Sequence, residues 1–385
     1  MKKILALALA LVFTLSACVA MAETVKIGVF EPSSGDSGAG GKQEALGMQY
    51  ANVETPTVEI GGVTYDVELV YADNGSSADK APSAAQSLVS EGVSVVLGSY
   101  GSVVSIAGSP IFADAGIPAI GVTCTNPQVT QGNDHYFRIC FLDPFQGTVL
   151  ANYAFKELGA TTAYCLAELG NDYDVGLVYY FTQAFEALGG TVISETFPSG
   201  NSDFTSYLAN ATAMGAGVLF APCSIAYSTQ IVEQAASQNV SFALLGSDTW
   251  DSNVVIDAAK GTSLSIYVST FYQEGGAPAF DEGIKAWLNS DSEALTNNGG
   301  NDMVAAVSAM GYDAYYVALE ALKAAGSTDP AAVKAVLQSV TYDGVSGSIA
   351  FDDVNGDAIR DTAYIKTANT ADGVWDFVTV QSVGE

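Results

Sequence analysis

Hydroxyl side chains follow two short apolar runs that are separated by one apolar helical segment. The run Val95–Leu97 precedes Ser102, and the run Pro118–Gly121 precedes Thr123 and Thr125. In a parallel sheet both strand ends open on the same edge, where ligands bind. Hydroxyls, free backbone N–H groups and a helix N-terminus favour a small anion such as a carboxylate. Because the segment carries no nucleophile–base pair and no set of metal ligands, it predicts that a solute is bound and not converted.

An acidic side chain, Asp248, follows another apolar run that ends at Gly246. At the exit edge of a strand this carboxylate would face a cleft and pair with a cation; alternatively, Ser247 and Asp248 only cap a following helix. An anion site in one half of the chain and a cation site in the other complement the zwitterion of an α-amino acid. Tyr173 precedes a helix at a further strand exit, where it either covers the ligand or packs at the helix start.

Enzyme and cofactor chemistry finds little support in the sequence. The only histidine, His135, stands next to a predicted strand without a nucleophile motif, and we expect a surface or capping role. The loop Gly35–Gln43 lacks the spacing of a phosphate-binding loop and is interpreted as a mobile rim over a pocket. The stretch Asp352–Asp357 misses the central glycine and closing glutamate of a calcium loop, which favours a hairpin turn. We therefore predict a protein that is not an enzyme and holds no metal or cofactor.

The net charge of the chain excludes two classes of binding partner. The chain has 42 acidic and 13 basic residues, a formal net charge of −29. Without a basic face, binding to nucleic acid or to anionic lipid headgroups is excluded. Cysteine is sparse and has no paired spacing, and we expect Cys124, Cys140, Cys165 and Cys223 to be buried free thiols.

Residues 1–22 have the composition of a bacterial export signal, with two lysines before an apolar run that is too short to span a bilayer. Two processing sites compete. Leu15–Cys18 fits a lipoprotein box, which would lipidate Cys18, whereas Ala20–Ala22 would allow cleavage after Ala22. The protein is therefore predicted to work in the periplasm or on the outer face of the cell membrane.

Strands and helices alternate along most of the chain, which predicts an α/β fold with parallel sheets covered by helices. About nine such units, with strand-end hydroxyls in both halves, favour two lobes over one large sheet. The expected strands are Val25–Phe30, Tyr65–Tyr71, Val95–Leu97, Ala119–Gly121, Thr162–Ala167, Thr191–Phe197, Val218–Pro222, Phe242–Gly246 and Leu264–Thr270. Helices are then expected over Phe280–Leu288, Met303–Ala325 and Pro330–Val340, followed by three short antiparallel pieces between Ile349 and Val380.

Eight motifs in order make the chain resemble periplasmic binding proteins of the branched-chain amino acid (Leu/Ile/Val) type, which serve ABC transporters. They are VKIGVFEPSSG, ELVYADN, VVLGSYGS, AGIPAIGVTCTNPQVTQ, YFRICFLDPFQG, GNDYDVG, ALLGSDTWDS and GYDAYYVALEAL, spread from Val25 to Leu322. The resemblance implies the type I periplasmic-binding-protein fold, with two lobes and three hinge crossovers.

The resemblance also implies roles for single residues. Ser102 and Thr125 would hold the ligand carboxylate, the Thr123 carbonyl and Asp248 would hold its ammonium group, and Tyr173 would cover it. In place of the usual aromatic residue of the first loop the chain has Gly38–Gly41, and Cys223–Ile225 replaces the usual tyrosine after Pro222. We expect Tyr100, Trp250 and Tyr312 to fill the side-chain pocket instead, and Gly101 to belong to the ligand-binding residues.

By this resemblance, one lobe comprises residues 25–143 and 271–360, and the other residues 144–270 and 361–385. The implied function is capture of an amino acid, branched-chain or related, by a monomeric protein that delivers it to the permease subunits of an ABC importer. The alternative is a binding protein or sensor for another small ligand, such as an amide, a small peptide or an aromatic acid. The sequence does not distinguish transport from sensing.

Overall fold

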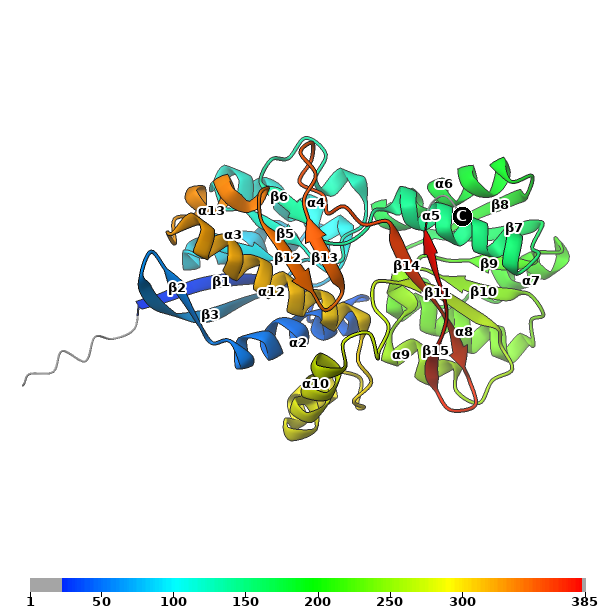
Figure 1. Ribbon diagram of the computed structural model, residues 1–385. Helices are drawn as coiled ribbons and strands as arrows, with labels where there is room; N and C mark the ends of the chain where they lie inside the picture. Colours follow the sequence, from blue (N-terminus) through cyan, green and yellow to red (C-terminus); the bar gives the residue numbers. More distant parts are fainter. Residues whose placement is uncertain (1–22, 383–385) are drawn as a thin grey trace, which may run out of the picture.

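The computed structural model describes residues 23–382 and consists of two lobes side by side, each built around its own sheet (Figure 1). The predictions for residues 1–22, including lipidation of Cys18 and cleavage after Ala22, lie outside the described residues. Within residues 23–382 no helix combines the length and the apolar character needed to cross a bilayer.

The first lobe contains a six-stranded sheet in the order β2-β3-β1-β4-β5-β6. All neighbours pair in parallel except β2 and β3, which form an antiparallel hairpin. Its strands are β1 (Glu23–Glu31), β2 (Thr57–Ile60), β3 (Val63–Asp73), β4 (Val95–Leu97), β5 (Ala119–Gly121) and β6 (Tyr136–Arg138).

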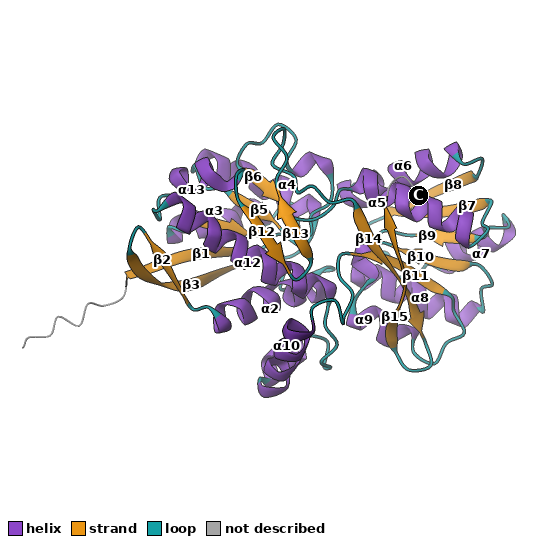
Figure 2. Ribbon diagram, in the orientation of Figure 1, coloured by secondary structure: helices purple, strands orange, loops and turns teal. Residues whose placement is uncertain are grey.

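Helices cover both faces of this sheet (Figure 2). On one face β1 directs Ile27 and Val29 into a core shared with α2 (Gly38–Glu54) and α12 (Ala306–Ala325). On the other face Phe30 packs with residues of α3 (Ala81–Glu91) and α4 (Ser102–Asp114). The alternation of β1 side chains between the two faces is the period of two that a strand imposes. The lobe is completed by α10 (Pro278–Ser290), α11 (Ser292–Asn297), α13 (Pro330–Leu337) and the hairpin β12 (Thr341–Gly344) and β13 (Gly347–Ala350).

Helices α2 and α12 approach each other closely although they stand near opposite ends of the chain. A Cβ on Gly47 would lie 1.9 Å from the carbonyl oxygen of Ser308, and one on Gly311 would lie 2.1 Å from that of Glu44. Only glycine at both positions allows this backbone contact.

The second lobe contains a seven-stranded sheet in the order β15-β14-β11-β10-β9-β7-β8. Its parallel strands are β7 (Thr162–Glu168), β8 (Thr191–Phe197), β9 (Val218–Phe220), β10 (Ala243–Gly246) and β11 (Ile266–Thr270), and its antiparallel edge is β14 (Thr362–Asn369) and β15 (Val374–Ser382). The helices are α5 (Asp143–Asn152), which continues as the π-helical η2 (Tyr153–Glu157), α6 (Asp172–Ala187), α7 (Thr205–Ala213), α8 (Ile225–Gln238) and α9 (Asn253–Ala259).

The chain passes between the lobes three times: between β6 and β7, between β11 and α10, and between β13 and β14. Most expected elements are present within a few residues of their bounds, whereas β2, β12, α9 and α11 are additional. The interpretation of Gly35–Gln43 as a mobile rim is wrong, because α2 already begins at Gly38 and Gly38, Gly40 and Gly41 are buried. Cys124, Cys140, Cys165 and Cys223 are free and buried, as predicted.

Candidate functional site

The two lobes meet at the strand ends that carry the predicted site residues. The hydroxyl of Tyr100 donates to the carbonyl oxygen of Thr249 at 3.4 Å, and the side chain of Asn126 donates to the carbonyl oxygen of Asp172 at 2.8 Å. Both bonds join the first lobe to the second, so the lobes are closed on each other. A cavity of about 100 Å³ remains between them, lined by Tyr100, Gly101, Ser102 and Val104 of the first lobe and by Asn171, Tyr173, Asp174 and Thr249 of the second, among others.

Ser102 is the first residue of α4, directly beyond β4, and it is buried. Its hydroxyl oxygen accepts the backbone N–H of Asn126 at 3.1 Å, which ties the loop after β4 to the loop after β5. Because the hydroxyl accepts in this bond, its own proton stays available to an acceptor. Gly101 precedes the helix with φ +113°, in the region where L side chains are strained.

Thr125 is buried in the loop after β5, and its hydroxyl forms no hydrogen bond among residues 23–382. It lies beside the carboxyl group of Asp143, the first residue of α5. Burial raises the pKa of Asp143 to about 7. A buried hydroxyl without a partner is rare, because losing its hydrogen bonds to water costs free energy. The hydroxyl of Thr125 thus has the Asp143 carboxyl as its one neighbouring acceptor among residues 23–382, and this contact lowers the pKa of Asp143 against the effect of burial.

Thr123 differs from the other two hydroxyl residues, because its proton is already engaged. The hydroxyl donates to Oε2 of Glu44, a fully buried residue of α2. Burial is the main cause that raises the pKa of Glu44 to about 7, against the hydrogen bonds from Glu31 and Thr123 that lower it, and the charge of Asp248 raises it further. Sequence analysis did not identify Glu44 as a site residue.

Asp248 lies in the short helix η3 (Asp248–Trp250) beyond β10 and is buried. Its Oδ1 accepts the side-chain amide of Gln146 at 2.7 Å and the hydroxyl of Tyr173 at 2.7 Å. Burial raises the pKa of Asp248 to about 6, while these two hydrogen bonds lower it. Among residues 23–382 Asp248 forms no ion pair. Sequence analysis also missed Gln146, whose amide on α5 bridges Asp248 and Ser269.

Tyr173 lies at the start of α6, and its hydroxyl contacts Asp248. The side chain of Asn171 caps α6 by accepting the backbone N–H of Tyr173 at 3.1 Å, so the residue belongs to a regular helix start. Its hydroxyl reaches across to β10, where it lies 2.8 Å from the Ser247 oxygen and 2.7 Å from Asp248. The helix start therefore positions the phenol at the candidate cation site.

The aromatic residues expected to fill the pocket separate into two groups. Tyr100 lies over Gly40, where a Cβ would come within 2.4 Å of the ring, and Trp250 is fully buried against Gly246. Tyr312 does not reach the site: its ring stacks on Tyr50, and its hydroxyl donates to Glu54 at 2.7 Å on the outer side of the first lobe.

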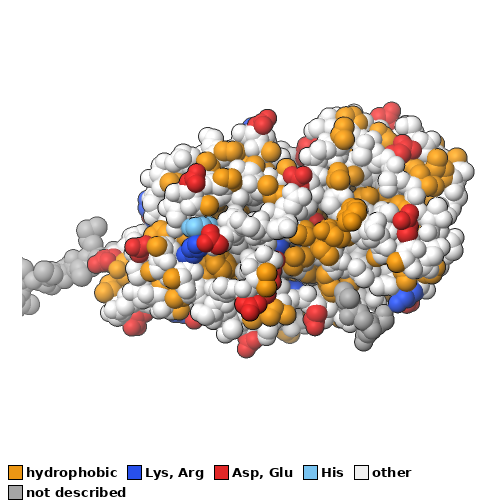
Figure 3. Space-filling model, turned by 90° about the horizontal axis from the view of Figure 1, so that it is seen from above, with side chains coloured by type: hydrophobic (Ala, Val, Ile, Leu, Met, Phe, Trp, Pro, Cys, Tyr) orange, Lys and Arg blue, Asp and Glu red, His pale blue; other side chains and the backbone are white. Residues whose placement is uncertain are grey.

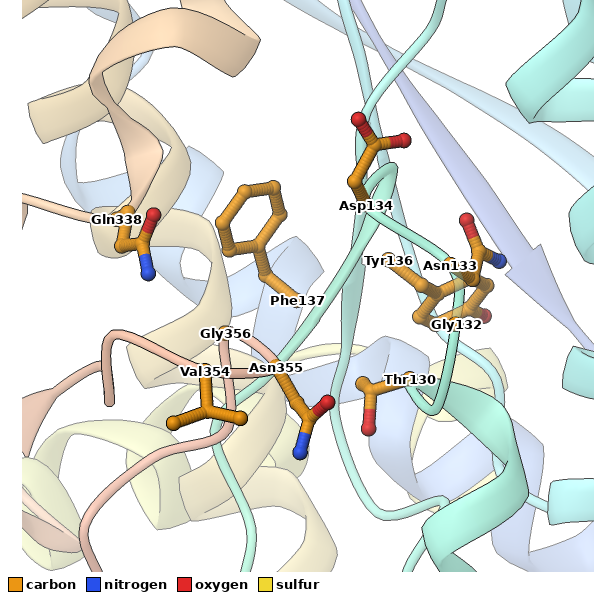
Figure 4. A pocket seen from close by; sticks show the side chains of 10 residues that line it. All are labelled: Thr130, Gly132, Asn133, Asp134, Tyr136, Phe137, Gln338, Val354, Asn355 and Gly356. Atoms are coloured by element: carbon orange, nitrogen blue, oxygen red, sulfur yellow. The ribbon is translucent and has the colours of Figure 1, made fainter.

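A larger cavity of about 350 Å³ lies within the first lobe (Figure 4). It is lined by Thr130, Gly132, Asn133, Asp134, Tyr136, Phe137, Gln338, Val354, Asn355 and Gly356. Its acidic group, Asp134, is already paired with Lys334 at 2.6 Å and with His135 at 2.7 Å. The histidine thus has the surface role expected of it, on the face shown in Figure 3. The cavity contains neither group of predicted site residues.

The chain was compared with known proteins. A family model described as periplasmic binding protein matches residues 24–372. A Leu/Ile/Val-binding protein homolog 1 of Brucella abortus is 26% identical over 362 residues, 92% of this chain and 93% of the relative. The crystal structure of a leucine binding protein from Thermotoga maritima superimposes with a TM-score of 0.83 at 31% identity, covering 94% of this chain and 99% of that chain.

A more distant structure shares the fold alone. The solute binding protein of an ABC transporter from R. palustris, solved with benzoate, has a TM-score of 0.79 at 19% identity, covering 93% of this chain and 96% of that chain. The similar structures match the mixed α/β architecture with parallel sheets and flanking helices.

Proposed function

The chain belongs to the periplasmic binding protein family, and from this premise we propose that it is the substrate-binding component of an ABC importer that captures a free amino acid between its lobes. The observation that carries the proposal is the buried Asp248 carboxylate, which accepts two neutral donors and has no cation of its own among residues 23–382. Burying a carboxylate without a positive neighbour costs free energy, which neutral hydrogen-bond donors offset only in part. The ammonium group of an amino acid would supply that charge.

The opposite end of the solute would meet the first lobe. Ser102 keeps a free hydroxyl proton, the hydroxyl of Thr125 lies beside Asp143, and α4 begins at Ser102 with N–H groups that have no partner within the helix. These donors suit a carboxylate. A zwitterion would thus bridge a donor group on one lobe and an acid on the other, and this bridging would favour the closed arrangement.

The relatives support the same class of solute. The leucine binding protein and the Leu/Ile/Val-binding homologue are named for amino acids. We propose, on this basis, that the solute is a branched-chain or related amino acid and that the partners are the permease subunits of the importer. Action outside the cytoplasm follows from the family, and the lipid anchor at Cys18 stays a prediction.

The test is a thermal-shift screen of the purified protein against the twenty amino acids and their amides, followed by titration calorimetry. A ligand that binds only the folded state raises the melting temperature, and at equal concentration a tighter ligand raises it further. For the tightest amino acid, two analogues serve as matched probes: the acid without the amino group and the amine without the carboxylate. We expect both to bind much more weakly; equal binding of the deaminated acid would contradict the proposal.

A further inference from the structure

The cavity between the lobes is lined by two buried side chains that each have a polar atom without a hydrogen-bond partner among residues 23–382. These atoms are Oδ1 of Asp174, on α6, and Oγ of Ser224, directly before α8. Both residues belong to the second lobe, both are buried, and both line the cavity of about 100 Å³. Unpaired buried polar atoms are rare because they cost free energy. Their common position in the cavity indicates that a solute supplies the missing partners.

One oxygen of Asp174 has a structural role and the other does not. Oδ2 accepts the backbone N–H of Glu168 at 2.9 Å, which ties the start of α6 to the end of β7. Within residues 23–382 no donor bonds to Oδ1, and Asp174 forms no ion pair. Burial is the main cause that holds the pKa of Asp174 well above its usual range, while the Glu168 N–H lowers it. The anchored Oδ2 thus fixes a carboxyl group whose second oxygen still lacks a donor.

The contact between the lobes explains why the hydroxyl of Ser224 is free. Ser224 stands at the N-cap of α8, where a serine oxygen normally accepts an N–H of the first helical turn. Here the side chain forms no such bond. The N–H of Ala226 donates instead to the backbone carbonyl of Asp36 in the first lobe, at 3.2 Å. The Ser224 hydroxyl can therefore donate to a solute or accept from it.

The other groups around the cavity favour a solute with hydrogen-bond donors. The aliphatic side chains of the lining are Val103 and Val104 on α4, which pack on the core of the first lobe. No lysine, arginine or histidine of the described chain lines the cavity, whereas three acids do: Asp36, Glu168 and Asp174. An aliphatic solute side chain would leave the two polar atoms unpaired, and an acidic one would add a further negative charge.

From these contacts we propose that Asp174 and Ser224 select an amino acid whose side chain ends in an N–H donor, either a carboxamide or an ammonium group. The N–H would donate to Oδ1 of Asp174. The Ser224 hydroxyl would accept a second N–H or donate to the amide oxygen. The proposal rests on the proposed function and narrows it: Asp248 would meet the α-ammonium group, and Asp174 the end of the side chain. The small cavity favours a short side chain.

The first experiment compares solutes of equal shape by calorimetry on the wild-type protein. Asparagine, aspartate and leucine have side chains with the same branching, and 2,4-diaminobutyrate has the shape of norvaline. We expect asparagine or diaminobutyrate to bind about 10- to 100-fold more tightly than its apolar counterpart, the range for a hydrogen bond to a charged group. Aspartate should bind more weakly than asparagine. A preference for asparagine alone identifies a carboxamide, and a preference for diaminobutyrate alone identifies an ammonium group.

Variants test whether the two residues cause this preference. Asp174→Asn keeps the shape, and its amide oxygen can still accept from Glu168, which turns the NH₂ group toward the cavity. The preference for the N–H donor should fall about 10- to 100-fold, while the affinity for the apolar counterpart is kept. Ser224→Ala should lower the preference about 2- to 10-fold, as expected for a neutral hydrogen bond.

The matched control is Asp172→Asn, which removes an exposed acid from the same helix start outside the cavity lining and should not change the preference. Melting temperatures verify that each variant is folded. Equally tight binding of the apolar counterparts, or an unchanged preference in both Asp174→Asn and Ser224→Ala, would overturn the inference and leave the proposed function intact. Failure of the wild type to bind any amino acid would instead refute the proposed function, and the inference with it.

Discussion

Buried carboxylates occur in two regions of the molecule with opposite surroundings. At the end of β6 and on β14 they are paired: Arg138 donates to Asp357 at 2.7 Å, and Lys366 donates to Asp251 at 2.9 Å. Between the lobes, Asp248 and Glu44 receive only neutral donors. The difference indicates which acids maintain the fold and which leave a charge to be matched by a solute.

Breaking one of the buried ion pairs should lower the stability of the protein more than any other change proposed here. Arg138 is fully buried and also donates to the carbonyl oxygens of Cys124 at 2.8 Å and of Asn126 at 2.6 Å. Arg138→Met should lower the free energy of unfolding by about 3–5 kcal/mol, because it leaves Asp357 buried and unpaired. Denaturant titration measures this loss. Arg138→Met together with Asp357→Leu should recover part of it; no recovery would mean that the pair itself is not the source.

Removing the unpaired carboxylate between the lobes should mainly lower the affinity for the amino acid. Asp248→Ala should weaken amino acid binding by about 3–5 kcal/mol, since the ammonium would be buried without its counter-charge. Calorimetry gives the affinity, and denaturant titration should show that stability is kept, because a carboxylate without a cation is removed. A near-unchanged affinity would contradict the assignment of Asp248 and place it with the structural acids.

The pH dependence of stability sharpens the same contrast. Burial raises the pKa of Asp143 and Glu44 to about 7 and that of Asp248 to about 6. The folded protein therefore binds more protons than the unfolded chain between about pH 4 and pH 7, where unfolded carboxyls are already ionised. Stability should fall as the pH rises through this range and level off above it, by about 1.4 kcal/mol for each unit of pKa shift.

Denaturant titrations at pH 5 and pH 8 test this expectation in the ligand-free protein. A saturating amino acid should flatten the profile, because its ammonium group stabilises the ionised carboxylates. If the ligand-free protein were more stable at pH 8 than at pH 5, the buried carboxyls of Asp143, Glu44 and Asp248 would not dominate the pH dependence of its stability.

The smallest loss of affinity is expected at the hydroxyl and N–H donors that would hold the solute carboxylate. Ser102→Ala should weaken amino acid binding by about 1–3 kcal/mol, because backbone N–H groups of α4 remain to hold the carboxylate. The measurement is the same calorimetric titration as for Asp248→Ala. A loss as large as that of Asp248→Ala would reverse the ranking of the two ends of the solute.

Local patterns were enough to predict much of the fold. The bounds of β4 and β5 agree with the sequence interpretation, because short apolar runs bounded by glycine and proline are unambiguous in a buried parallel sheet. Strand β2 was not predicted, since it has four residues and alternates at an edge. The first turn of α2 was interpreted as part of the loop Gly35–Gln43 because glycines are poor helix formers. The ring of Tyr100 over Gly40 explains why one of these positions is glycine.

The site was predictable only where a residue follows a strand end. Ser102, Thr123, Thr125 and Asp248 share that position, which places them at one edge of their sheets. Glu44 and Gln146 lie on helices, where a polar side chain normally indicates a solvent-facing surface. Their contacts, Glu44 with Thr123 and Gln146 with Asp248, span 79 and 102 residues of sequence. No local pattern encodes such pairings.

The packing of α2 on α12 constrains the order in which the chain can fold. The glycine contacts at Gly47 and Gly311 join segments that are made far apart in time during synthesis. Until Ala325, the end of α12, has left the ribosome, the sheet that begins with β1 lacks one of the helices that cover its face. Such distant pairing slows folding. The amino-terminal half of a nascent chain should therefore stay protease-sensitive and chaperone-dependent until synthesis is nearly complete.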